Sequence, residues 1–375
     1  MLDQPLYQKV YDYLLEGIRS GKFTTEERLP SEKELADEFR VSRITSKRAL
    51  ELLATNGIIK RMPGKGSFLI GENGSAAGIE DAVETKTRKN TMIGVVVAGF
   101  SESYGTNLLS GIELEASLSG SYIIPKRSHG KQNMEEDIID ELMDIGVDGI
   151  IIMPVHGEHY NRKIIKLVLD KFPIVLLDRN LKGIPTAFVG SDNVAAAKKM
   201  TDYLLEQGHR NISFLSVPPE NTSTIEDRIK GFIRSHADHG IQIDESQWLL
   251  NIAGTLPEKK APDHIAEDIV KIRQLIVANP SVTCLFAAEY NIALIALEAV
   301  RSLGYSVPED ISVVCFDGPR SMFNDYFFTH ARQDETKMGQ LAVKLLLDAL
   351  EGSVKGEQIY LDTELVYGKS VKKNT

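Results

Sequence analysis

The chain has few cysteines and no long apolar run. Its 375 residues include two cysteines, Cys284 and Cys315, and both lie in apolar stretches that resemble strands. Such residues are typical of buried free thiols in a reducing compartment, which argues against a disulfide framework. No stretch reaches the roughly 18 apolar residues that span a bilayer, and the residues after Met1 do not resemble a signal peptide. We therefore expect a cytoplasmic protein with no membrane partner.

The motifs of common catalytic and metal sites are also missing. Residues 64–66 are too short for a phosphate-binding loop and open no helix, and no Gly-x-Ser-x-Gly elbow is present. The pairs His156/His159 and His236/His239 have spacings that suit a metal ion. No cysteine or acidic residue is arranged to complete either set. The sequence thus predicts no metal, no cofactor and no enzyme.

Charge is divided unevenly along the chain. The whole sequence is acidic, with 43 Lys and Arg against 53 Asp and Glu and a formal net charge of −10. Residues 40–66 have the opposite balance, since they hold seven Lys or Arg and one acid, Glu51. Attraction of nucleic acid is therefore expected to be concentrated on this basic segment.

The basic segment belongs to a pattern of short helices followed by a hairpin. A helix is predicted over residues 31–39, where Ser31 and Glu34 fit a capping box. Ser42 begins a second helix, and residues 58–69 form two extended runs around a Gly-Lys-Gly tip. Helix, turn, helix and basic hairpin are the layout of a winged helix-turn-helix, which binds duplex DNA.

The second helix of this unit has one apolar and one basic side. At 100° per residue, Ile44, Lys47 and Arg48 point away from the apolar side. The two cations can reach guanine or phosphate in a major groove, and Ile44 can contact a thymine methyl group. Lys65, at the tip of the hairpin, places a further cation near the sugar-phosphate backbone.

Residues 5–70 resemble the DNA-binding domain of the GntR-type bacterial repressors. The matching segments are Leu-Pro-Ser-Glu-Lys-Glu-Leu at 29–35, Val-Ser-Arg-Ile-Thr-Ser-Lys-Arg-Ala-Leu at 41–50 and Gly-Lys-Gly-Ser-Phe at 64–68. The resemblance implies DNA contacts from Lys33, Ser42, Arg43, Thr45, Lys47 and Gly66. Lys33 and Lys47 stand where members often have Arg, which argues against bidentate guanine contacts there. Ser46 stands where a branched apolar residue is usual and should loosen the packing beneath its helix.

Beyond residue 70 the pattern changes twice. Residues 71–90 mix Gly, Ser and Ala with scattered charges and are expected to form a linker. From residue 91 onward, short apolar runs alternate with amphipathic helical stretches in two series. The predicted fold class is α/β, with a winged helix-turn-helix over 1–70. Two lobes, each a doubly wound parallel sheet, are predicted over 91–375.

Polar residues follow the predicted strands, which is where doubly wound folds bind their ligands. They are Ser101, Tyr104, His156, Asp178, Arg179, Asp192, Glu289, Tyr290 and Asp317. Carboxylates and an Arg make directed hydrogen bonds, and aromatic rings pack on the apolar face of a sugar, so this set suits a polyhydroxylated ligand. Asp192 is also well placed to cap the helix that follows it.

Residues 91–368 resemble the effector-binding region of the lactose/galactose repressor family, which is itself similar to periplasmic sugar-binding proteins. Specific matches are Val-Leu-Leu-Asp-Arg at 175–179, Gly-Ser-Asp-Asn at 190–193, Val-Pro-Glu-Asp-Ile at 307–311 and Arg-Gln-Asp at 332–334. The resemblance places around the effector Tyr104, Arg179, Asp192, Arg228, Phe316, Asp317 and Gln333. Where this family commonly has Asn-Asp, the chain has Glu289 and Tyr290, so the identity of the ligand does not carry over.

Together these features predict a ligand-responsive repressor of carbohydrate-utilisation genes. A homodimer would place two winged domains on a pseudo-palindromic operator, and a monosaccharide bound between the lobes would release the DNA. The joining of these two parts resembles the arabinose repressors of Gram-positive bacteria. A purine or amino-acid effector remains an alternative. So do a sugar-acting enzyme, with Asp178, Asp192 and Glu289 as acid–base groups, and a sugar-binding transport component.

Overall fold

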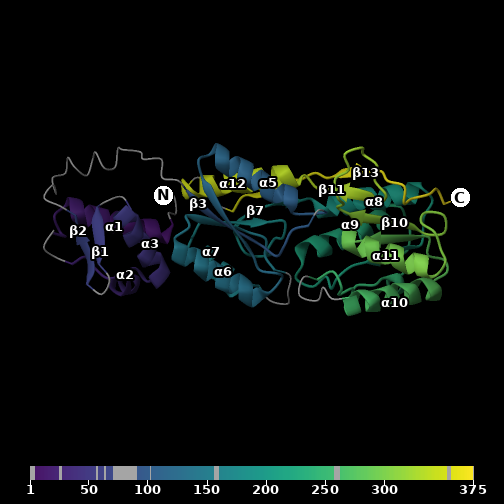
Figure 1. Cartoon of the computed structure of the whole chain (residues 1–375), viewed down its shortest axis with the longest axis horizontal. Helices are drawn as coiled ribbons and strands as arrows, with labels where there is room; N and C mark the ends of the chain where they lie inside the picture. The colour runs from purple at the N-terminus through teal and green to yellow at the C-terminus, as the bar shows by residue number, and fades with distance from the viewer. Residues whose placement is uncertain are drawn as a thin grey trace.

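A computed structural model describes residues 5–24, 28–55, 58–62, 65–70, 91–101, 103–155, 160–256, 262–352 and 356–374. Its elements form a small helical domain followed by two α/β lobes in a row (Figure 1). The expected linker over 71–90 and the pair His156/His159 lie outside the described residues. None of the described helices is long and apolar enough to cross a bilayer.

The amino-terminal domain has the predicted helix, turn, helix and hairpin. Its elements are α1 (Leu6–Arg19), α2 (Glu32–Phe39), α3 (Arg43–Thr55), β1 (Ile59–Met62) and β2 (Gly66–Leu69), the last two antiparallel. Their apolar sides meet in one core around Leu14, Leu35 and Leu50. The capping box is confirmed, because the Glu34 amide donates to Ser31 Oγ at 3.3 Å and the Ser31 amide donates to the Glu34 carboxylate at 2.6 Å.

Ser46 does not loosen the packing under α3 as its size suggested. The side chain is fully buried, and its Oγ lies 2.6 Å from the Glu32 carbonyl oxygen and 3.0 Å from that of Arg43. The hydroxyl therefore satisfies a carbonyl at the start of α2. A hydrogen bond between the two helices replaces the apolar contact of a branched side chain.

Lobe 1 is built on a six-stranded parallel sheet in the order β12-β7-β6-β5-β3-β4. Its strands are β3 (Met92–Val97), β4 (Tyr122–Arg127), β5 (Gly149–Ile152), β6 (Ile174–Leu177), β7 (Ala187–Ser191) and β12 (Gln358–Leu361). One face packs on α5 (Thr106–Leu118) and α12 (Glu335–Leu350), and the other on α6 (Gln132–Ile145) and α7 (Arg162–Leu169). Since both faces are covered, β5 and β6 are buried at every residue.

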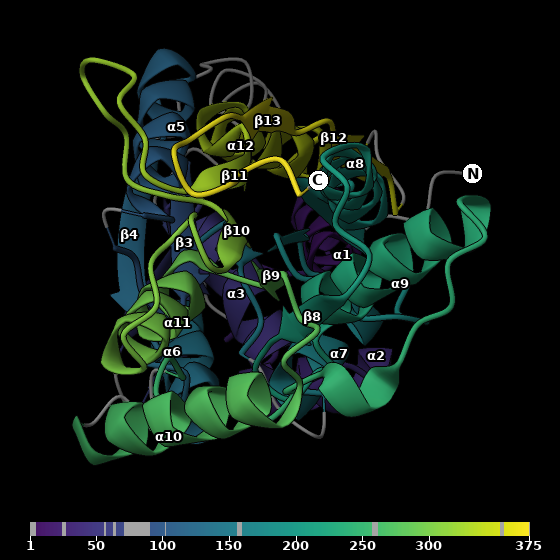
Figure 2. The same cartoon turned by 90° about the vertical axis from the view of Figure 1, so that its right-hand side faces the viewer.

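Lobe 2 has a five-stranded sheet in the order β13-β11-β10-β9-β8, with β13 antiparallel to its neighbour. The strands are β8 (Ile212–Leu215), β9 (Cys284–Ala287), β10 (Ser312–Phe316), β11 (Thr329–Arg332) and β13 (Glu364–Val366). Figure 2 shows the pair α8 (Asn193–Glu206) and α9 (Ser223–Asp238) on one side of the sheet, and α10 (Pro262–Ala278) and α11 (Tyr290–Ser302) on the other. A 3-10 turn lies at Glu245–Gln247. Cys284 and Cys315 are buried free thiols, as predicted.

The two lobes are not two successive segments of chain. Among the described residues, the chain passes between lobes after β7, after β11 and after β12, so that α12 and β12 return to lobe 1. Helix α12 packs closely on α5, because a Cβ at Gly111 would lie 2.1 Å from the Thr336 carbonyl oxygen. A Cβ at Gly339 would lie 2.3 Å from the Leu108 carbonyl oxygen. The apolar runs of the sequence do not predict this return.

Candidate functional site

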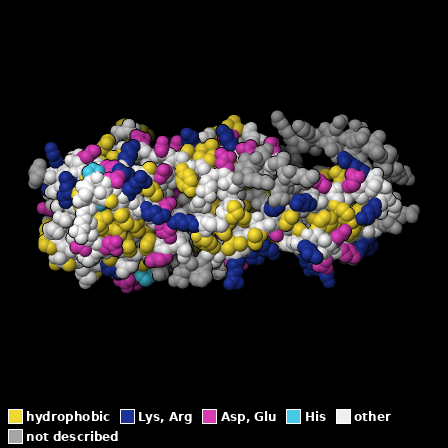
Figure 3. Space-filling view, turned by 180° about the vertical axis from the view of Figure 1, so that it is seen from behind, with side chains coloured by type: hydrophobic (Ala, Val, Ile, Leu, Met, Phe, Trp, Pro, Cys, Tyr) yellow, Lys and Arg dark blue, Asp and Glu magenta, His cyan; other side chains and the backbone are white. Residues whose placement is uncertain are grey.

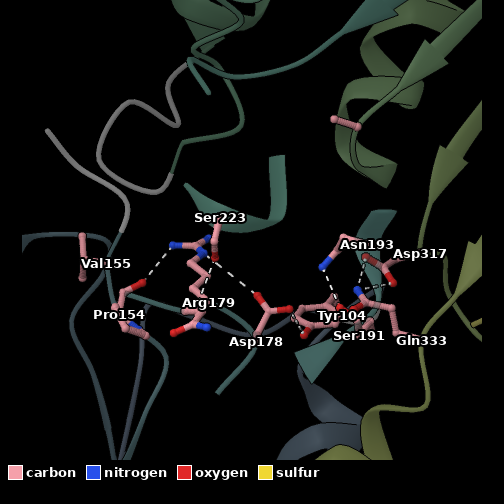
Figure 4. Close-up of polar contacts among 12 residues, drawn as sticks. Tyr104, Pro154, Val155, Asp178, Arg179, Ser191, Asn193, Ser223, Asp317 and Gln333 are labelled. Atoms are coloured by element: carbon pink, nitrogen blue, oxygen red, sulfur yellow. Dashed lines mark hydrogen bonds and ion pairs between the residues drawn. The ribbon is translucent and has the colours of Figure 1, made fainter. Parts of the chain in front are cut away.

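Two buried carboxylates lie at equivalent strand ends in the two lobes. Asp178 follows β6 and Asp317 follows β10, and both have left-handed backbone, with φ of 62° and 63°. Tyr104 donates its hydroxyl hydrogen to Asp178 Oδ1 at 2.8 Å. Gln333 Nε2 donates to Asp317, at 3.0 and 3.1 Å from its two oxygens. Figure 4 shows these four side chains close together at the junction of the lobes.

Burial and neighbouring charge set the protonation of this group. Burial raises the pKa of Asp317 to about 7; Arg228 and Gln333 act in the opposite direction, and the carboxylates of Glu335 and Asp178 raise it further. Burial also raises the pKa of Tyr104 well above its usual range, with Asp178 and Asp317 adding to the effect. The carboxylates of both lobes therefore share one electrostatic environment.

Arg228, on α9, is held rigidly beside this group. Its Nε donates to Asn193 Oδ1 at 2.7 Å and its Nη1 to the Ala288 carbonyl oxygen at 2.6 Å. The guanidinium carbon lies 3.8 Å from the centroid of the Phe316 ring. Because Phe316 is fully buried, its ring supports the Arg228 guanidinium in this structure. A direct contact between Phe316 and a ligand stays a prediction.

Three other predicted residues are placed by backbone contacts. Arg179 Nη1 donates to the Pro154 carbonyl oxygen at 3.1 Å, and its Nε lies 4.0 Å from Asp178 Oδ2, which keeps Arg179 beside the carboxylate group. Asp192 caps α8, since its Oδ1 accepts from the Ala195 amide at 2.8 Å. Ser101 is exposed on the lobe 1 side. Only Arg179 of these three contacts the carboxylates directly.

Glu289 and Tyr290 lie at the start of α11 in lobe 2. Glu289 occupies the N-cap position without a side-chain capping bond. The Tyr290 ring packs edge-to-face on Phe328, with 5.8 Å between centroids, and approaches the backbone at Gly318, next to Asp317. The structure therefore brings Tyr290 to the lobe 2 side of the same region.

The structure adds residues that the sequence analysis missed. A pocket at the lobe junction is lined by Asp178, Asn180, Ser191, Asn193, Ser223 and Tyr360, among others. In the described part of the chain, Ser191 Oγ and Gln333 Oε1 are buried without a hydrogen-bond partner. Ser191 and Asn193 flank Asp192 in the Gly-Ser-Asp-Asn segment, and that motif could have predicted them. Tyr360 was not, because β12 reaches lobe 1 only through the tertiary fold.

The predicted DNA-binding residues fall into an exposed and a covered group. Lys33, Arg43 and Lys65 are exposed. The winged domain displays Lys and Arg side chains at the right of the space-filling view (Figure 3). Gly66 has φ of 111°, a backbone conformation that favours glycine at the hairpin tip. Ser42 caps α3, accepting from the Thr45 amide at 3.1 Å.

The outer side of α3 contacts lobe 1. The Arg48 guanidinium donates to the Gly146 carbonyl oxygen and to Asp148 Oδ1. Lys47 Nζ lies 3.2 Å from Asp144 Oδ1. Thr45 and Ile44 also contact lobe 1. Thr45 Oγ1 lies 3.5 Å from Asp170 Oδ2, and Ile44 packs against the core beneath α6 and α7. Figure 1 shows α3 next to α7.

Comparison with known proteins agrees with both parts of the fold. Residues 6–69 match the gntR family of bacterial regulatory proteins, and residues 201–371 match a periplasmic binding protein-like domain. The chain therefore combines the two parts of a DNA-binding transcriptional regulator, a gntR-type winged domain and periplasmic-binding-protein-like lobes.

Several known proteins match this chain over most of their own length. The chain is 26% identical over 351 residues to the arabinose metabolism transcriptional repressor of Geobacillus stearothermophilus, covering 92% of each. It is 28% identical over 273 residues to the regulator GalS of Salmonella typhimurium, covering 72% of this chain and 75% of that protein. The structure of a complex of the regulator CelR with cellobiose superposes with a TM-score of 0.64 at 21% identity, covering 91% and 99% of the two chains. That structural likeness supports the fold.

Proposed function

We propose that the protein is a repressor of carbohydrate-utilisation genes that a monosaccharide releases from its operator. The observation that carries this proposal is the group of carboxylates at the lobe junction, in a chain that begins with a gntR-type winged domain. Asp178 and Asp317 offer acceptors to sugar hydroxyls from opposite lobes, and Arg228 offers a fixed donor. The relatives named as arabinose and ribose repressors favour a sugar over the purine and amino-acid alternatives.

A ligand at this junction has unsatisfied groups to bind. Ser191 Oγ and Gln333 Oε1 would each gain a hydrogen bond, which removes the cost of burying an unpaired polar atom. The ligand would contact both lobes and so favour one relative position of the two. A coupling of about 1–3 kcal/mol between this site and DNA binding is usual for such switches.

The repressor acts, in this proposal, as a homodimer in the cytoplasm. Large apolar side chains are exposed on α5 and at the start of β4, with Leu118 73% and Tyr122 60% exposed. The loop between β10 and β11 carries Met322 and Phe323, 91% and 85% exposed. Figures 1 and 2 place this loop and α5 on the same side of the molecule. Burial of such a surface in a twofold interface would align two winged domains on a palindrome.

The proposal is tested with duplex DNA and a ligand panel together. A selected pool of palindromic duplexes should yield an operator in a mobility-shift experiment. L-arabinose, D-ribose, D-galactose, guanine and single amino acids are then compared for thermal stabilisation and for release of that operator. One monosaccharide should do both. If a nucleobase or an amino acid does so instead, the sugar assignment is wrong, and a chain that selects no duplex is not a repressor.

A further inference from the structure

The outer side of α3 is the surface that would enter a major groove, and lobe 1 covers it. Arg48 and Thr45 are 8% and 7% exposed, although both lie in the first turns of the helix. In a winged helix-turn-helix these turns contact base edges. The same side chains cannot be buried against protein and lie in a DNA groove at once, so the two contacts exclude each other.

The contact on lobe 1 is matched in charge. Its acceptors are Asp144, Asp148 and the carbonyl oxygen of Gly146, at the carboxyl end of α6 and the loop after it. A helix carboxyl end carries partial negative charge, which suits the cations of α3. Ile44 packs on the apolar side of α6 and α7. The docking surface therefore offers phosphate-like negative charge to side chains predicted to bind DNA.

We propose that lobe 1 holds the winged domain in an autoinhibited state, with the α6–α7 surface competing with operator DNA for the outer side of α3. This inference rests on the proposed function. It adds a regulatory contact to that function. The observed DNA affinity is the intrinsic affinity multiplied by the fraction of molecules in which α3 is released from lobe 1. Weakening the docking surface without touching α3 should therefore tighten operator binding.

Two substitutions on lobe 1 test this. Asp148→Asn removes the charge that faces Arg48 and keeps an oxygen for the Met92 amide, which now donates to Asp148 Oδ2 at 2.9 Å. Asp144→Lys opposes Lys47 on the surface. The control is Glu141→Lys, on the same helix with the same change of charge, where the present partner is Lys126. Asp148→Asn should tighten operator binding by about tenfold, and Asp144→Lys should do so severalfold more than the control. Affinities of both variants no higher than that of the control would overturn the proposal.

A cross-link provides the converse test. Glu51→Cys with Asp144→Cys, joined by a short cleavable bismaleimide, should form an intrachain product, since both side chains lie within 4.0 Å of Lys47 Nζ and Cys284 and Cys315 are buried. This product should lose operator binding and regain it on cleavage of the linker. Absence of the intrachain product, a product only between chains, or full operator binding by the linked protein each contradicts autoinhibition. If neither wild type nor cleaved protein binds any duplex, the proposed function fails instead.

Discussion

Lobe 1 has two polar boundaries, and they differ in the sign of the charges they bring together. Towards the winged domain, cations of α3 meet carboxylates of lobe 1, as in the pairs Lys47–Asp144 and Arg48–Asp148. Towards lobe 2, the carboxylates of Asp178, Asp317 and Glu335 lie near one another, with Arg228 close by. One boundary matches opposite charges, and the other concentrates like charges.

The difference explains why one boundary is a contact and the other a site. Opposite charges stabilise the docked surfaces with groups of the chain itself. Burial is the main cause of the raised pKa of Asp317, the carboxylates of Glu335 and Asp178 add to it, and a ligand that donates hydrogen bonds would relieve that cost. In the proposed function, a molecule from outside completes the interlobe boundary. Four substitutions can break or sharpen this comparison.

The largest effect is expected from the pH dependence of Asp317→Asn. The folded-state pKa of about 7 lies above the ordinary value of 3.8 for this carboxyl, so ionising Asp317 costs stability progressively between about pH 4 and pH 7. One pKa unit corresponds to about 1.36 kcal/mol. The gain in unfolding free energy from Asp317→Asn should therefore be up to about 4 kcal/mol larger at pH 8 than at pH 4. Denaturant unfolding of both proteins at the two pH values measures this. A difference independent of pH would show that burial does not raise the pKa of Asp317.

Arg228→Ala should come next. Truncation leaves Asn193 Oδ1 and the carboxylate of Asp317 without their cationic neighbour, at a cost near 3 kcal/mol. We expect effector affinity to fall by about 100-fold in calorimetric titration, with operator binding unchanged. Arg234→Ala, an exposed cation on the same helix, is the control. If the effector concentration that releases the wild type from operator also releases Arg228→Ala, Arg228 does not bind the effector.

Lys65→Ala separates DNA binding from docking. Lys65 is exposed on the hairpin, away from the Lys47–Asp144 contact. Its loss should weaken binding to every duplex by about fivefold and reduce the slope of log affinity against log salt by about one. Lys199→Ala, an exposed cation on lobe 2, should leave both unchanged. Mobility shifts over a salt series measure this slope. If the slope for Lys65→Ala equals that of the wild type, the hairpin tip does not contact the DNA.

The smallest effect is expected for Ser46→Ala. This change removes the hydroxyl that now lies 2.6 Å from the partly buried Glu32 carbonyl oxygen, which costs about 1 kcal/mol of unfolding free energy. Effector affinity should not change, because Ser46 lies in the winged domain. Chemical unfolding of the wild type and variant gives the value. A stabilised variant would mean that the hydroxyl indeed loosens the core beneath α3.

Much of the fold follows from local pattern. The capping box at Ser31, the buried runs of β5 and β6, and the strand-end positions of Asp178 and Asp317 were all predicted from sequence periodicity and turn residues. Asp192 is the instructive case, because the same motif position suits a ligand or a helix cap. The Ala195 contact confirms the cap, and the ligand contact stays a prediction. Resemblance to known families supplied Arg228 and Gln333, which no local pattern marks.

The amino-acid sequence by itself determined the winged helix-turn-helix, the most apolar strands such as β5 and β6, and which carboxylates end the strands, because these depend on neighbours a few residues apart. Only the tertiary structure decided that α12 and β12 return to lobe 1, that Phe316 supports Arg228, and that lobe 1 covers α3. Contacts such as Arg48–Asp148 join residues 100 positions apart. Their free energy depends on how whole domains pack, and no local pattern records that.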